Sequence, residues 1–69
     1  MKRTVYYRIE RGWTNNIGRL YVAFVIGPYL EIIGHNGCGM DISDALQNLR
    51  LHLNDIGYSD VLLEEKLWD

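Results

Sequence analysis

The sequence predicts an α+β domain: a three-stranded antiparallel meander with one helix packed on one face, in the order β-β-β-α, plus a short C-terminal strand or helical turn. Residues 4–10 alternate apolar and polar side chains with a period of two, which is typical of a half-buried strand. Residues 42–56 place apolar side chains at helical spacing. With 69 residues, the chain is expected to form one domain, residues 1–69.

The first two strands are predicted to form a hairpin. Residues 4–10 make the first strand, and residues 14–18 are turn formers that tolerate positive φ. Residues 19–26 make the second strand. Because this second strand is apolar on both sides, it is expected to lie in the centre of the sheet.

A third strand is predicted at residues 29–33, after a turn at Gly27 and Pro28. Proline fixes φ and cannot donate a hydrogen bond to a ladder, so it favours a turn here. Residues 34–39 are rich in glycine and are expected to end the sheet.

The helix is predicted to begin near Asp41, whose carboxylate can cap the free amides of the first turn, and to stop at Gly57 in a left-handed cap. Its apolar stripe consists of Ile42, Ala45, Leu46, Leu49, Leu53 and Ile56. Residues 58–69 fit either a strand or a short helix, and their alternation favours a short edge strand.

Composition and charge narrow the classes of function. The longest apolar run, residues 20–26, is far shorter than the roughly 20 residues of a membrane-spanning helix. Cys38 is the single cysteine, so no internal disulfide forms, and the chain is expected to be cytoplasmic. The net charge is -2, with basic residues concentrated in residues 1–33 and acidic residues in residues 34–69, which gives the molecule a polar axis.

Candidate chemistry is sparse. His35, Cys38, Asp41 and His52 are the only group whose side chains suggest a metal site or a nucleophile. Their spacing does not give the paired ligand clusters of a structural zinc site. The sequence therefore predicts no metal, no cofactor and no catalytic residue, and the chain is expected not to be an enzyme.

A binding face is predicted on the side of the sheet away from the helix. The side expected to face the helix carries Val5, Tyr7, Ile9, Leu20, Val22, Phe24, Leu30 and Ile32. One helix covers one face, so tyrosines and aliphatic residues are left exposed around an arginine, as in protein interfaces. The predicted protein-binding residues are Tyr6, Arg8, Tyr21, Tyr29, Glu31 and Ile33. Burial of this face by the tail or by a second copy of the chain is the alternative.

Two further surfaces remain open as hypotheses. The tyrosines and arginines of the outer face could stack single-stranded nucleic acid, although the acidic net charge disfavours it. An acidic surface could instead dock on a basic partner, with a purely solvated surface as the alternative. Its residues are Asp55, Asp60, Glu64 and Glu65.

The order of three strands and a helix resembles the HicB-type antitoxin domain, a truncated RNase H-like fold. Residues 21–25, followed by a glycine-containing turn, and the helix start at residues 41–50 carry the resemblance, which covers roughly residues 4–54. It implies a non-catalytic module that neutralises a small RNA-cleaving toxin by protein contact. A small acidic chain of this kind also fits a phage or mobile-element inhibitor of a host-defence system, similar to an anti-CRISPR protein.

Overall fold

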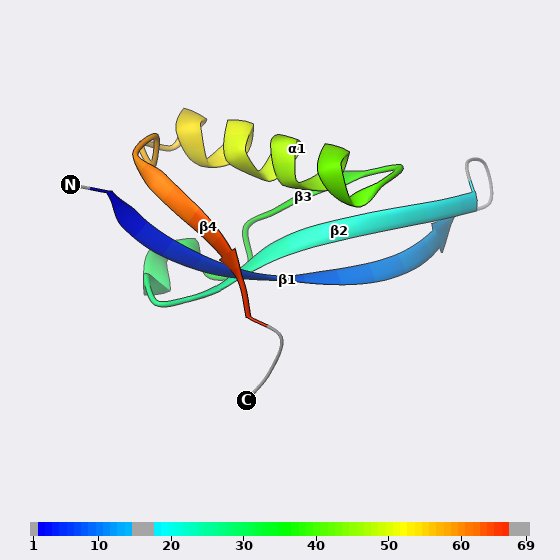
Figure 1. The fold of residues 1–69 in the computed structure, drawn as a ribbon, viewed down its shortest axis with the longest axis horizontal. Helices are drawn as coiled ribbons and strands as arrows, with labels where there is room; N and C mark the ends of the chain where they lie inside the picture. The colour runs from blue at the N-terminus through cyan, green and yellow to red at the C-terminus, as the bar shows by residue number, and fades with distance from the viewer. Residues whose placement is uncertain (1, 15–17, 67–69) are drawn as a thin grey trace.

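The computed structural model describes residues 2–14 and 18–66. These residues form a four-stranded mixed sheet with the strand order β3-β2-β1-β4, and one α-helix covers one of its faces (Figure 1). The elements are β1 (Arg3–Thr14), β2 (Gly18–Gly27), a 3-10 turn η1 (Leu30–Ile32), β3 (Asn36–Gly39), α1 (Ile42–Asp55) and β4 (Val61–Glu65). The predicted α+β class is confirmed, but the number and arrangement of the strands differ from the prediction.

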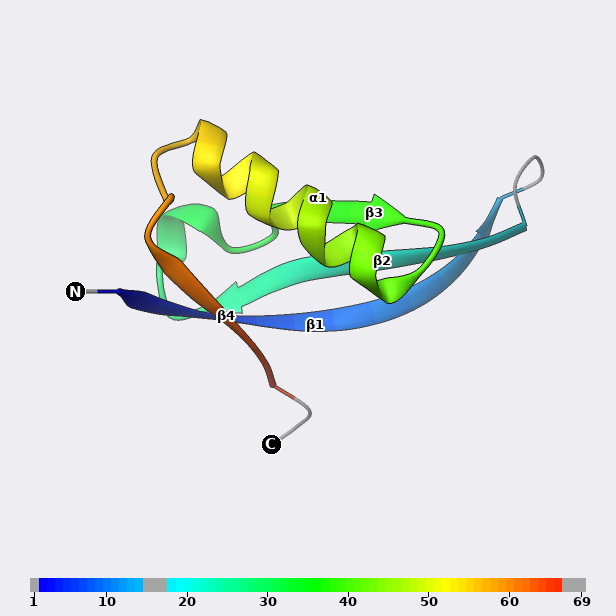
Figure 2. The same ribbon diagram turned by 45° about the horizontal axis from the view of Figure 1, so that its top comes forward.

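The hairpin of β1 and β2 is the longest part of the sheet, and it extends past the N-terminal end of α1 (Figure 2). Its register pairs Tyr7 with Val25 and Ile9 with Ala23. Directly opposed residues share a face, so Ala23 and Val25 lie on the same side as Tyr7 and Ile9. Of the turn predicted at residues 14–18, residues 15–17 lie outside the described residues.

The third strand is not at residues 29–33, so that prediction is wrong. The N–H of Ile32 donates to the carbonyl of Tyr29 at 3.0 Å, and the N–H of Ile33 donates to Leu30 at 3.3 Å. These bonds between neighbours close a 3-10 turn in place of a ladder. The strand that pairs with β2 is β3, in the glycine-rich segment that was predicted to end the sheet.

Glycine is required in β3 because α1 packs directly on its backbone. A Cβ added at Gly37 would lie 2.7 Å from the Cα of Leu49, and one added at Gly39 would lie 2.8 Å from the amide nitrogen of Ala45. Any side chain at these two alternating positions would therefore push α1 away from the sheet. Glycine is depleted in strands generally, which explains why the glycine-rich sequence of residues 34–39 did not predict strand β3.

The predicted ends of the helix are confirmed. The side chain of Asp41 accepts a hydrogen bond from the amide of Asp44 at 2.8 Å, and Gly57 has a φ of 98° just after the helix. The stripe is buried only in its middle, since Ile42 and Ile56 lie at the two ends of the helix and are 47% and 40% exposed. The core consists of Val5, Tyr7, Ala23, Val25, Ile32, Ala45, Leu49, Leu53 and Val61.

The tail forms the edge strand β4, as favoured from the sequence, but it runs parallel to β1. The sheet is therefore mixed and not a pure meander, because α1 carries the chain back across the sheet before β4 begins (Figure 1). Within the described residues, no helix has the length and apolar character needed to cross a membrane.

Candidate functional site

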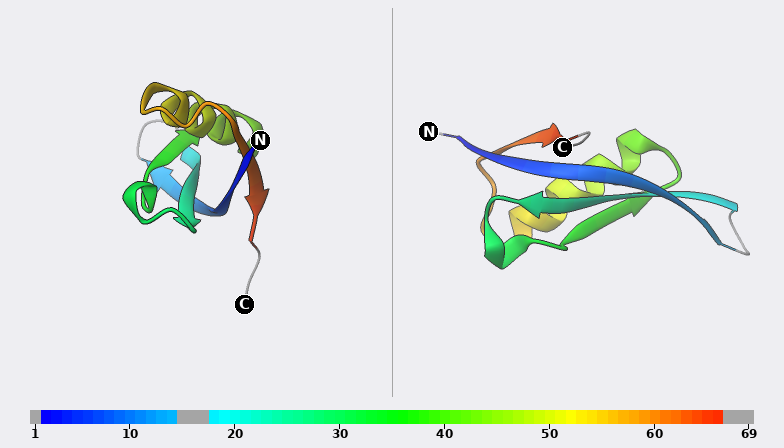
Figure 3. Two further views of the ribbon diagram at one scale, coloured as in Figure 1. Left: turned by 90° about the vertical axis from the view of Figure 1, so that its left-hand side faces the viewer. Right: turned by 90° about the horizontal axis from the view of Figure 1, so that it is seen from below.

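The face of the sheet opposite α1 is not covered by any of the described elements. Seen from that side, β1 and β2 lie in front and α1 lies behind them (Figure 3, right). We call this surface the open face. The strand registers place on it Thr4, Tyr6, Arg8, Glu10, Val22, Phe24, Ile26, Asn36, Cys38, Leu62 and Glu64.

The centre of the open face is an apolar row along β2. Val22, Phe24 and Ile26 follow one another at alternate positions, and each is half-buried. Arg8 of β1 stands directly opposite Phe24, and Glu10 stands opposite Val22. The row is therefore flanked by charged side chains on its β1 side.

One end of the apolar row opens into a hollow of about 310 Å³ lined by Tyr6, Ile26, Gly27, Pro28 and Lys66. The Nζ of Lys66 lies 5.2 Å from the centre of the Tyr6 ring, within the range of a cation–π contact. An aromatic ring and a cation thus border a concave end of an otherwise flat face.

The charges on and beside the open face are mixed. Arg8 and Lys66 are basic, and Glu10 and Glu64 are acidic, so neither sign dominates. Among the described residues, no three or more histidine, cysteine, aspartate or glutamate side chains gather into a group that could hold a metal ion. The open face therefore offers apolar contact area together with side chains that can form hydrogen bonds.

The predicted binding residues divide between two parts of the molecule. Tyr6 and Arg8 lie on the open face, as predicted, and their role in binding stays a prediction. Tyr21 does not lie there, because it pairs with Gly39 on the side that faces α1 and packs against the core. Ala23 and Val25, at alternate positions from Tyr21 along β2, also lie on the side that faces α1.

We call the side of the sheet that α1 packs on the covered face. Tyr29 and Glu31 form a cluster with Arg3 and Tyr58 at the end of this face. The neighbouring Ile33 is 45% exposed in the loop after η1. The guanidinium carbon of Arg3 lies 4.3 Å from the ring centre of Tyr58, whose ring is 5.9 Å from that of Tyr29. The hydroxyl of Tyr58 donates to the carboxylate of Glu31, and this hydrogen bond lowers the pKa of Glu31.

The four residues of the predicted acidic surface do not form one surface. Asp60 accepts hydrogen bonds from the guanidinium of Arg3 at 2.7 and 3.3 Å, and these bonds lower the pKa of Asp60. Glu64 and Glu65 are successive residues of β4, so they point to opposite faces of the sheet. Asp55 is the last residue of α1.

The apolar residues at the centre of the open face were missed, since Val22 and Phe24 were predicted to face the helix. A signal was present in the sequence. Ala23 pairs with Gly37, and small residues on both strands let a helix approach closely. The alternate glycines Gly37 and Gly39, together with Ala23 opposite Gly37, mark the covered side of these two strands.

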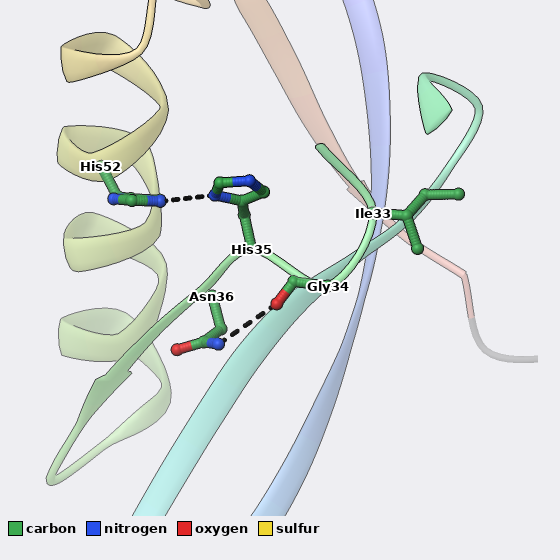
Figure 4. Close-up of a pocket in the computed structure, with 5 residues that line it drawn as sticks. All are labelled: Ile33, Gly34, His35, Asn36 and His52. Carbon is green, nitrogen blue, oxygen red and sulfur yellow. Dashed lines mark hydrogen bonds between the residues drawn. The ribbon is translucent and has the colours of Figure 1, made fainter. Parts of the chain in front are cut away.

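The four residues considered for a metal site also lie in different parts of the structure. His35 and His52 meet at the edge of the sheet, where they help to line a second hollow (Figure 4). Cys38 is exposed on the open face, opposite Val22, and the carboxylate of Asp41 caps α1. Only the two histidines are in contact.

Fold and site together define a small α+β domain with one uncovered sheet face. Comparisons of this chain with protein-family models, with curated proteins and with solved structures found no match. The resemblance to HicB-type antitoxins therefore stays a prediction.

Proposed function

We propose that this chain is a non-catalytic protein-binding module that inhibits a partner protein by occluding its surface. The observation that carries the proposal is the apolar row of Val22, Phe24 and Ile26 on the open face, bordered by Tyr6 and Arg8. Protein interfaces combine an apolar centre with a polar rim, and they are enriched in aromatic residues and arginine. The open face has this composition and arrangement.

The distribution of charge favours a protein partner over a nucleic acid. A surface that binds single-stranded nucleic acid tracks its phosphates with an excess of basic side chains. On the open face Glu10 lies beside Arg8 in β1, and Glu64 lies opposite Tyr6. These carboxylates would repel a phosphate backbone at both ends of the apolar row.

The resemblance to HicB-type antitoxins makes a small RNA-cleaving toxin the first partner to test, and a host-defence effector is the second. The order of strands and helix that carries the resemblance is present, with the third strand moved to Asn36–Gly39. In either case the chain would act by covering the functional surface of its partner.

The test compares two apolar side chains that differ in location. Phe24→Ser removes the central ring of the open face, whereas Leu30→Ser makes the same kind of change at a residue that is 82% exposed on η1. With purified toxin or effector, calorimetric titration is expected to show that Phe24→Ser lowers the affinity by about 30-fold, as for an interface hot spot. Leu30→Ser is expected to change it by less than about threefold.

Three outcomes would contradict the proposal. One is a larger loss for Leu30→Ser than for Phe24→Ser, since binding would then use η1. Another is tight, strongly salt-dependent retention of single-stranded RNA that Phe24→Ser abolishes, which would make the face a base-stacking platform. The third is a concentration-dependent dimer in sedimentation velocity that Phe24→Ser dissolves, which would assign the face to a second copy.

A further inference from the structure

Two imidazole rings meet at the edge of the sheet beside an open space. Nδ1 of His35 lies 2.7 Å from Nε2 of His52, and the ring centroids are 4.9 Å apart with an angle of 27° between the ring planes. Figure 4 shows these two nitrogens directed toward each other. The hollow next to them measures about 440 Å³ and is also lined by Ile33, Gly34 and Asn36.

Both rings are attached to ordered backbone. The N–H of His35 donates to the carbonyl of Ile32 at 3.1 Å, and the carbonyl of His35 accepts from the N–H of Val25 at 3.0 Å. His52 projects from α1, a regular helix whose middle is buried against the sheet. The hydrogen bond between the rings already brings the two nitrogens together in the folded chain, as a preorganised ligand pair requires.

We propose that His35 and His52 form a binding site for a divalent transition-metal ion such as Zn²⁺, with water in the adjoining hollow completing the coordination shell. Two imidazole nitrogens bound to one tetrahedral Zn²⁺ at 2.0–2.1 Å lie about 3.3 Å apart. The observed separation of 2.7 Å has to widen only slightly, and side-chain rotation supplies this movement.

The protons of the pair fit such a site. In the hydrogen bond, one ring donates its N–H to the lone pair of the other ring. To bind a metal ion, the donor ring moves that proton to its second ring nitrogen, so both facing nitrogens present lone pairs. A neutral pair loses no proton in this step, whereas a singly protonated pair releases one.

The chemistry of the ligands selects the class of ion. Imidazole nitrogen favours Zn²⁺, Cu²⁺ and Ni²⁺ over Mg²⁺ and Ca²⁺, which prefer oxygen. Cys38 does not contribute, because it lies opposite Val22 on the open face, away from α1, which carries His52. Asp41 does not contribute either, since its carboxylate caps α1.

The experiment titrates ZnCl₂ into the full chain at pH 7.5, with calorimetry for affinity and the imidazole NMR signals for location. One ion per chain is expected, with shifts of both His35 and His52. Replacing either ligand, in His35→Ala or His52→Gln, is expected to lower the affinity at least about tenfold, since even residues outside the ligand shell affect affinity by that factor. Cys38→Ser is the matched control and is expected to bind as the unmodified chain does.

Loss of binding in Cys38→Ser, or unchanged binding in a His52→Gln variant that circular dichroism shows to be folded, would overturn the site. Zinc binding without a shift of the two imidazoles would also overturn it.

Discussion

The two faces of the sheet are built from the same strands but are used differently. On the covered face Val5, Ala23 and Val25 have no exposed surface, because they share the core with Ala45, Leu49 and Leu53 of α1. On the open face Val22 and Phe24, from the same strand β2, are only half-buried. Where α1 approaches most closely, the covered side carries the small residues Ala23, Gly37 and Gly39, whereas Phe24 and Ile26 of β2 point to the other side. Hydrophobicity alone therefore does not identify the buried face of a central strand.

The largest expected effect comes from filling the space between β3 and α1. In Gly37→Ala the new Cβ would lie 2.7 Å from the carbonyl carbon of Asn48 and from the Cα of Leu49, and closer still to the amide nitrogen of Leu49. Backbone cannot move aside as a flexible side chain does, so we expect a loss of about 3 kcal/mol in the free energy of unfolding, measured by urea denaturation.

Gly12→Ala is the control for this change. Gly12 is also a strand glycine, and a Cβ added there would meet no atom within 4 Å. Its free energy of unfolding is expected to change by less than about 0.5 kcal/mol. Equal losses in the two variants would show that α1 does not rest on β3 as the structure has it.

Much of the fold can be predicted from the sequence because local chemistry determines it. The alternation of residues 4–10 identifies the buried side of β1, and Asp41 and Gly57 locate the ends of the helix. The third strand could not be found in this way. Its pairing with β2 comes from tertiary contact. Its glycines are required because α1 leaves no space for a Cβ, and glycine itself does not favour strands.

The candidate site was predicted less completely, for a related reason. Tyr6 and Arg8 lie on β1, where one face is clearly polar, so their side could be inferred. In β2 both faces are apolar, and an error of one position exchanges the two faces. The contact of His35 with His52 joins a loop to a helix, and no local pattern predicts such a pairing.

A matched pair of tyrosines, one on each face of the sheet, tests the comparison further, with an expected loss of stability smaller than that of Gly37→Ala. Tyr21 packs against the core on the covered side, and Tyr6 lies on the open face. We expect Tyr21→Ala to lower the free energy of unfolding by about 1–2 kcal/mol, because it removes partly buried aromatic area.

Tyr6→Ala is expected to have the smaller effect on stability and the larger effect on partner binding. Thermal unfolding followed by circular dichroism, together with titration of the partner, gives both quantities for each variant. Greater destabilisation by Tyr6→Ala than by Tyr21→Ala would mean that the register of β2 is displaced by one residue.

The smallest effect concerns the ion pair that joins the start of β1 to the loop before β4, at the edge of the covered face. The hydrogen bonds from Arg3 lower the pKa of Asp60 from the ordinary value of 3.8. The carboxylate is thus favoured in the folded state, so the pair stabilises the fold at pH values above the ordinary pKa of an aspartate. That stabilisation is lost as the pH falls through the lowered folded-state pKa. Both side chains are partly exposed, so salt weakens the pair.

An NMR titration of the Asp60 carboxyl carbon measures this pair directly. In Arg3→Gln the hydrogen bonds from the guanidinium are gone, so the titration midpoint of Asp60 is expected to rise toward 3.8. Arg11→Gln removes the same charge from the part of β1 that β4 does not reach, and it is expected to leave the midpoint unchanged. If the two variants shift the midpoint equally, net charge and not the contact with Arg3 sets the pKa of Asp60. The ion pair would then contribute nothing specific to joining β1 and β4, and the backbone bonds between the strands would hold that edge alone.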